Sequence, residues 1–177
     1  SNETVLVYGG TSGVGSAAIQ ICNDLGAIVI ATAGNDEKCE YSANMGAHHV
    51  VNHNQDNWLN EVKNITGKRG VDVVFEHIGF ATWEQSQRIL SKGGRIVTCG
   101  ATTGADVNIN LAHLFMKQQT ILGSTMSSIS SYKEVMDKIE NGKYIPMVDK
   151  VIPMEDIRDA HAYLENRQQM GKVVVVP

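Results

Sequence analysis

The residues of this sequence best suited to chemistry form a glycine-rich run near the N-terminus. Three glycines let the backbone turn tightly and approach a pyrophosphate, and a helix that begins there presents N–H groups and a positive dipole end to the anion. Ser12 replaces the middle glycine of the usual G-x-G-x-x-G pattern, so the match is to a variant. We expect the anion on the N–H groups of residues 12–15. The residues of this phosphate-binding loop are Gly10, Thr11, Ser12, Gly13, Val14 and Gly15.

The end of the second apolar run bears on which dinucleotide the loop would serve. NAD sites usually carry an acidic residue about 20 residues past the glycines, where it accepts a hydrogen bond from the ribose 2′-OH. At that place this chain has small or neutral residues, among them Gly34 and Asn35, while Lys38 and His53 could approach a 2′-phosphate. We therefore expect NADP. The alternative is NAD, with Asp36 on the ribose and Lys38 as a solvated helix charge.

A second group of candidate residues follows the fourth and fifth apolar runs, residues 71–75 and 95–99. Ligands of open parallel sheets bind at the carboxyl ends of strands, so this group would line the nicotinamide side of the site. Core packing is an equally good interpretation of Cys99, and His77 could hydrogen-bond a ribose. No motif places a proton donor beside the nicotinamide, and we assign no catalytic residue. The group is Ile78, Gly79, Cys99, Gly100 and Ala101.

The elements that must position these residues alternate along the chain. Short apolar runs predict strands buried on both faces, and apolar residues three and four apart predict amphipathic helices between them. Asn35 is expected to cap one helix, Thr82 with Gln85 a second, and Ser131 with Glu134 a third. This order predicts an α/β fold with a doubly wound, parallel six-stranded sheet. Its strands are expected at residues 5–7, 27–32, 48–51, 71–75, 95–99 and 120–125.

Composition bounds the class of protein. The chain has 177 residues, a net charge of −4 and 42% hydrophobic residues, which is typical of a globular domain and gives no electrostatic footprint for nucleic acid or an anionic membrane. No apolar run approaches the roughly 20 residues of a membrane span, and there is no apolar leader. The three cysteines include no C-x-x-C pair, so we interpret them as buried thiols of a cytoplasmic protein.

The C-terminal part differs in style from the rest. Residues 1–143 carry the regular alternation and are interpreted as the dinucleotide-binding domain. Residues 144–177 contain all three prolines, two of them within residues 144–153, possible short strands at 149–152 and 172–176, and a helix between them. The apolar strands of this tail need cover from another part of the protein or another chain.

Four blocks of residues, in this order, resemble the medium-chain dehydrogenase/reductase superfamily, and within it the zinc-type alcohol dehydrogenases and quinone oxidoreductases. They are residues 9–22 (GGTSGVGSAAIQIC), 71–79 (VDVVFEHIG), 92–104 (KGGRIVTCGATTG), and the ending Ala160-His161 with 171–174 (GKVV). The resemblance covers nearly the whole chain and implies a Rossmann domain. In the quinone oxidoreductase branch a lysine and an aromatic or polar residue at positions matching Lys38 and His53 hold the 2′-phosphate.

The resemblance also implies parts beyond this chain. Members carry an N-terminal catalytic domain that holds the zinc ligands, where present, and most of the substrate pocket, and the tail packs on it. Ser1-Asn2 looks like the scar of a cleaved tag, which favours an excised cofactor-binding half over a natural truncation. The histidines and cysteines have no metal-ligand spacing, so we expect no zinc here. We also expect no turnover by this chain alone, because no motif supplies a proton donor and half of the substrate pocket would lie in the catalytic domain. Family dimers predict a homodimer through the edge strand 120–125.

Two other classes of function are alternatives to a quinone, enone or alcohol oxidoreductase. A short-chain-type reductase also suits the glycine loop but needs a Tyr-x-x-x-Lys pair, and no tyrosine here has a lysine four residues on. A non-catalytic nucleotide-sensing module stays open. The substrate is not encoded in these motifs.

Overall fold

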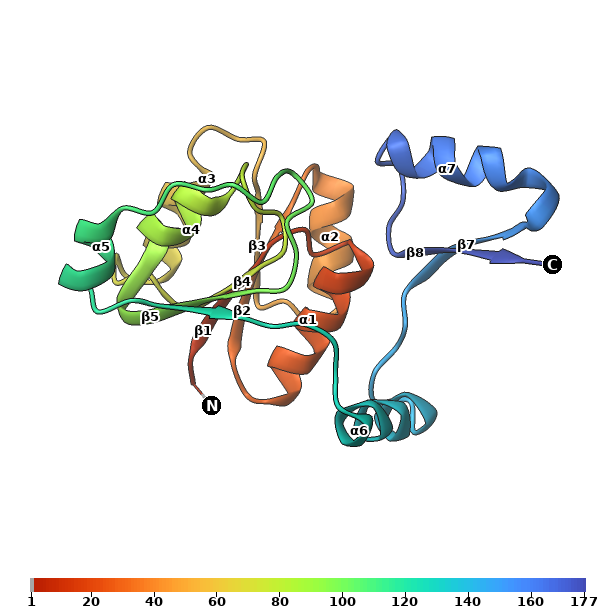
Figure 1. Ribbon diagram of the computed structural model, residues 1–177, viewed down its shortest axis with the longest axis horizontal. Coiled ribbons are helices and arrows are strands. Elements are labelled where there is room, and N and C mark those ends of the chain that lie inside the picture. The colour runs from red at the N-terminus through yellow and green to blue at the C-terminus, as the bar shows by residue number, and fades with distance from the viewer. Residues whose placement is uncertain (1) are drawn as a thin grey trace.

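The computed structural model describes residues 2–177, and its main body is a six-stranded parallel sheet in the order β3-β2-β1-β4-β5-β6 (Figure 1). Both the predicted fold class and the number of main strands are confirmed. The order reverses between β1 and β4, and that switch point is where open α/β sheets bind ligands. The strands are β1 (Thr4–Val7), β2 (Ile28–Ala33), β3 (His49–Asn52), β4 (Val71–Glu76), β5 (Leu90–Thr98) and β6 (Thr120–Gly123).

Helices cover both faces of this sheet because the central strands are apolar on both sides. On β1, Leu6 belongs to a core with α3 and α4, whereas Val5 and Val7 pack against Ala18 and Ile19 of α1. The helices of the main body are α1 (Gly13–Asp24), α2 (Asp36–Asn44), α3 (Trp58–Ile65), α4 (Trp83–Ile89), α5 (Leu111–Met116) and α6 (Ile129–Glu140). None of the helices within residues 2–177 combines the length and hydropathy that a membrane crossing requires.

Two of the predicted helix caps are wrong. Thr82 makes no side-chain cap to α4, because its hydroxyl donates instead to the carboxylate of Glu76 at 2.9 Å. Helix α6 begins before Ser131: Ser128 is its cap and accepts from the Ser131 N–H at 3.1 Å. The predicted cap of α2 is confirmed, since Asn35 accepts from the N–H of Lys38.

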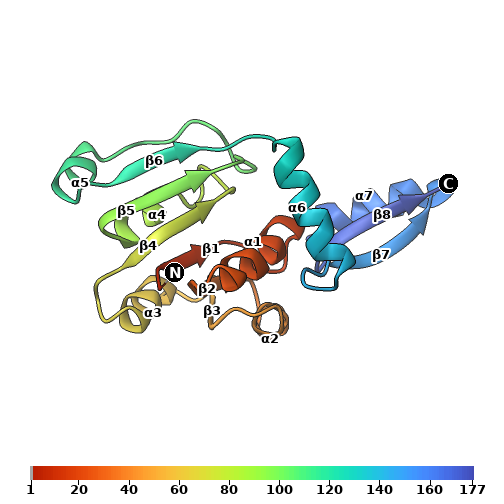
Figure 2. The ribbon, with the colours of Figure 1, turned by 90° about the horizontal axis from the view of Figure 1, so that it is seen from below.

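The tail forms a small unit of its own beyond the carboxyl end of the main sheet (Figure 2). Strands β7 (Val148–Pro153) and β8 (Lys172–Val176) pair in parallel, joined by the short 3₁₀ helix η1 (Met154–Asp156) and by α7 (Ile157–Glu165). Several apolar side chains of this unit are exposed, which agrees with the expectation that they need cover: Val148, Val151, Val174 and Val176. The division into domains at residue 143 stays a prediction.

The tail is nevertheless tied to the main body by polar contacts. The Gln20 side chain of α1 donates to the carbonyl of Ile145 and accepts from its N–H at 2.8 Å. The hydroxyl of the buried Tyr144 donates to Asp24 at 2.7 Å, and lysines from α6 and the following turn pair with the same carboxylate. These hydrogen bonds lower the pKa of Asp24 well below its usual range. The contacts fix where the tail lies relative to α1.

Candidate functional site

The glycine loop lies between β1 and α1, where the sequence predicts it. Gly9 turns the chain with φ +59°, the Ser12 N–H donates to the Gly9 carbonyl, and Gly13 is the first residue of α1. The Ser12 side chain caps this helix by accepting from the Gly15 N–H at 2.9 Å. Two of the four N–H groups expected to face an anion are therefore used within the loop. The N–H of Val14, in the first turn of α1, has no acceptor within the helix and can donate to a ligand, whereas the N–H of Gly13 lies beside Gly171, which bridges Ser12.

Space around the loop explains why its glycines are needed. A Cβ on Gly15 would overlap the carbonyl group of Gly9, which is backbone and has little room to move. A Cβ on Gly10 would lie 2.5 Å from the Ser42 hydroxyl oxygen. At Gly13 the space is taken by the side chain of Lys172, the first residue of β8. The loop thus packs on its own strand, on α2 and on the tail.

The residues predicted to select the cofactor come together at the end of β2. A Cβ on Gly34 would lie 3.6 Å from Nε2 of His53, and Asn35 caps α2 one residue on. Partial burial, followed by the positive charge of Lys38, lowers the pKa of His53. The ammonium of Lys38 donates to the main-chain carbonyl of Arg167 at 2.7 Å. The tail therefore contacts Lys38 at the end of β2, and the sequence motifs do not predict this contact.

The carboxyl ends of β4 and β5 also meet. A Cβ on Gly100 would lie 3.2 Å from the His77 carbonyl oxygen, and a Cβ on Gly79, whose φ is +89°, would lie 3.0 Å from the Cα of Ala101. His77 hydrogen-bonds the Tyr8 carbonyl through Nε2 at 2.9 Å. The predicted pair 78–79 and the predicted residues 99–101 thus form one edge. Cys99 is exposed rather than part of the core, and partial burial raises the pKa of its thiol.

The sequence motifs do not identify Glu76, whose side chain holds the backbone of residues 78 and 79 in place. Its side chain is fully buried, and one carboxylate oxygen accepts from the N–H groups of Ile78 and Gly79 at 2.8 and 3.1 Å. The hydroxyls of Thr82 and Ser86 donate to the other carboxylate oxygen. The available signal was an acidic residue at the end of an apolar strand, just before the predicted site residues.

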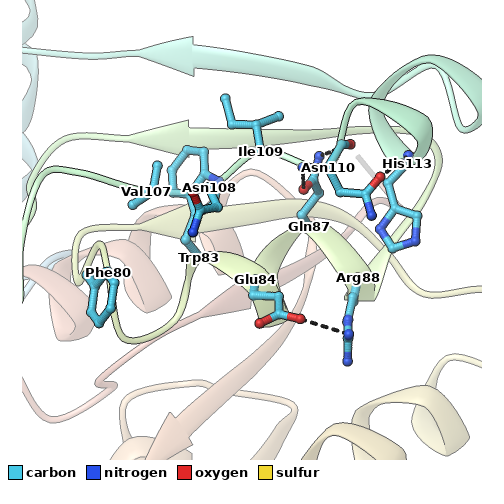
Figure 3. A pocket seen from close by; sticks show the side chains of 10 residues that line it. All are labelled: Phe80, Trp83, Glu84, Gln87, Arg88, Val107, Asn108, Ile109, Asn110 and His113. Atoms are coloured by element: carbon cyan, nitrogen blue, oxygen red, sulfur yellow. Dashed lines mark hydrogen bonds and ion pairs between the residues drawn. The ribbon is translucent and has the colours of Figure 1, made fainter.

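A separate cavity of about 460 Å³ lies between α4 and residues 107–113 (Figure 3). Phe80 and Val107 give it an apolar end, while Arg88 pairs with Glu84 at the other. None of the predicted cofactor residues lines it. The indole N–H of Trp83 has no partner within residues 2–177.

Metal binding is a separate question for the site. Within residues 2–177 no three histidine, cysteine, aspartate or glutamate side chains come together in a group that could hold a metal ion.

Comparisons with known proteins agree on the kind of protein. The family model of zinc-binding dehydrogenases matches residues 13–141. A quinone oxidoreductase of Rattus norvegicus is 31% identical over 185 residues, covering 99% of this chain and 55% of that protein. A crotonyl-CoA carboxylase/reductase of Cereibacter sphaeroides is 29% identical over 198 residues, covering 98% of this chain and 46% of that protein.

Solved structures give the same answer. An NAD-dependent alcohol dehydrogenase is 40% identical with a TM-score of 0.92, and 99% of this chain covers 51% of it. A crotonyl-CoA carboxylase/reductase in complex with NADP is 26% identical with a TM-score of 0.90, and 99% of this chain covers 50% of it. The chain thus spans about half the length of the proteins it matches. It belongs to the zinc-binding dehydrogenase family, within the medium-chain dehydrogenase/reductase superfamily of NAD(P)-dependent oxidoreductases.

Proposed function

We propose that this chain is the cofactor-binding part of an oxidoreductase and holds the pyrophosphate of a nicotinamide dinucleotide on the loop 10–15. The observation that carries the proposal is the glycine loop at the start of α1, where the N–H groups of the first turn have no acceptor within the helix. They lie at the switch point of the sheet, where the positive end of the helix dipole also favours an anion. The glycines let the loop pack closely against Gly9, Ser42 and Lys172.

The rest of the cofactor would extend along the carboxyl ends of the strands in both directions. The adenosine ribose lies toward Gly34 and His53, and the nicotinamide lies toward residues 78–79 and 99–101. When bound, the nicotinamide supplies the hydride that is exchanged with a substrate. The residues of this chain bind and orient the cofactor, and none of them is assigned a proton transfer. Quinone reductases and an enoyl-CoA reductase among the relatives favour a conjugated carbonyl compound as substrate of the whole protein.

The corner formed by Lys38 and His53 favours NADP over NAD. The Lys38 ammonium stands beside the Arg167 main chain and makes no ion pair with an acidic side chain within residues 2–177, so it is available to a 2′-phosphate. The neighbours themselves are divided, since one is named an NAD-dependent alcohol dehydrogenase and another is a complex with NADP, so the choice rests on Lys38 and His53.

Lys38→Ala is expected to weaken NADPH binding about tenfold, the value of one charge-assisted hydrogen bond, and to leave NADH binding unchanged. Calorimetric titration of both nucleotides measures the two affinities. Lys133→Ala removes an exposed lysine of α6 far from the loop and serves as the control. Equal affinities of the wild type for the two nucleotides, or an NADH preference that Asp36→Ala abolishes, would return the assignment to NAD.

The edge of the main sheet carries a proposal about assembly. Strand β6 pairs only with β5, so its outer side offers free backbone groups, and Leu122 is 44% exposed. We expect two chains to join β6 to β6 about a two-fold axis. Sedimentation velocity at micromolar concentration should show a dimer, and Leu122→Lys, which brings two like charges together at the axis, should shift it to monomer. A monomeric wild type would contradict the proposal.

A further inference from the structure

The geometry points to Lys172, the first residue of β8, as a ligand of the cofactor pyrophosphate. This inference rests on the proposed dinucleotide binding and adds a residue from the tail to it. The glycine loop would then supply one side of the phosphate site through backbone N–H groups. The tail would supply the other side through a positive charge.

The placement of Lys172 is fixed by its neighbours in the chain. Gly171 forms an isolated parallel bridge with Ser12, the cap of α1, and the Lys172 N–H donates to the carbonyl of Met147 at 2.7 Å. The side chain then runs across the first residue of the helix. Its Cδ and Cγ would lie 2.6 and 3.0 Å from a Cβ built on Gly13. Gly13 is thus the residue that lets the lysine approach the start of α1.

The charges around the exposed Lys172 favour an anion at this position. The N-terminus of a helix carries a partial positive charge, which repels a cation and attracts an anion. The first turn of α1 has no acidic residue, and the Lys172 ammonium makes no hydrogen bond or ion pair within residues 2–177. A cation beside the positive end of α1 is stabilised if an anion binds between them.

The donors available at this point match a pyrophosphate. The N–H of Val14, in the first turn of α1, has no acceptor within the helix, and the lysine ammonium adds up to three more donors. A pyrophosphate diester carries two negative charges and several acceptor oxygens, so it can bridge the helix start and β8. The same contact would hold the tail against the main body when the cofactor is bound.

The alternative is that Lys172 only packs its aliphatic stem on Gly13. Lys172→Met tests this because methionine keeps an unbranched apolar stem and removes the charge, whereas Lys172→Arg keeps the charge. Lys133→Met is the matched control on an exposed lysine of α6. Circular dichroism and thermal unfolding of each variant establish that the fold is retained.

Titration of NADPH, NADH, adenosine 2′-monophosphate and inorganic pyrophosphate by calorimetry decides between the two roles. Lys172→Met should weaken NADPH and NADH by the same factor, about tenfold, because both carry the pyrophosphate. Binding of adenosine 2′-monophosphate should not change, since it lacks that group, and Lys172→Arg should retain binding of both dinucleotides. Inorganic pyrophosphate should compete with NADH for the wild type and more weakly for Lys172→Met.

The outcomes separate this inference from the proposed function. Wild-type affinity of Lys172→Met for both dinucleotides, or a loss confined to NADPH, overturns the assignment of Lys172 and leaves dinucleotide binding intact. A wild type that binds neither dinucleotide contradicts the proposed function itself. If Lys172→Met does not fold, Lys172→Gln with the same titrations takes its place.

Discussion

Gly15→Ala is expected to lower the free energy of unfolding by about 3 kcal/mol and to remove most of the affinity for dinucleotides. The added Cβ would lie 2.8 Å from the carbonyl carbon of Gly9 and closer still to its oxygen. That carbonyl already accepts from the Ser12 N–H, and Gly9 holds a left-handed conformation that most residues avoid. Relief of the overlap therefore requires the whole loop to shift away from the start of α1.

Urea denaturation followed by circular dichroism measures the loss of stability, and calorimetry measures the loss of binding. Gly123→Ala is the matched control, because a Cβ at that position meets nothing within 4 Å and its backbone is not left-handed. We expect that control to stay within about 1 kcal/mol of the wild type. A Gly15→Ala protein that matches the control in both measurements would show that the loop does not need its close approach to Gly9.

The sequence predicts the glycine loop correctly but not all of the helix caps. The loop was recognised because its strand, its glycines and its helix follow one another within about twenty residues, so local signals suffice. Caps are less certain where several candidates lie together: four serines, at positions 127, 128, 130 and 131, precede Tyr132, and Ser128 rather than Ser131 is the one with extended backbone at the start of α6. Thr82 was misassigned because a buried acceptor competes for its hydroxyl.

Contacts between distant parts of the chain could not be predicted in the same way. Lys38 was recognised as a candidate from its position near the end of β2, but its hydrogen bond to Arg167 spans 129 residues. The contact of Lys172 with Gly13 likewise depends on where the tail folds, which is set by Tyr144, Asp24 and the bridge at Ser12. Periodicity and motifs carry no information on such placements.

Glu76 depends on both local and distant contacts. Its hydrogen-bond partners are close in sequence, but its burial depends on the whole sheet. The side chain is inaccessible to solvent, and only donors surround its oxygens: two backbone N–H groups of residues 78 and 79 and the hydroxyls of Thr82 and Ser86. The Tyr8 hydroxyl extends the network through Ser86 at 3.1 Å. The carboxylate therefore fixes the turn that begins the proposed nicotinamide side of the site.

Glu76→Ala is expected to destabilise the fold by about 3–5 kcal/mol, because it leaves several buried donors without an acceptor. Glu76→Gln should cost less, since its carbonyl oxygen keeps one set of hydrogen bonds while its NH₂ group opposes a donor on the other side. Urea denaturation measures both, with Glu84→Ala as the control, because Glu84 is a 72% exposed side chain of α4 whose loss should change stability by less than about 1 kcal/mol. Equal stability of Glu76→Ala and Glu84→Ala would mean that water or a rearranged turn satisfies these donors, and that Glu76 does not hold residues 78 and 79 in place.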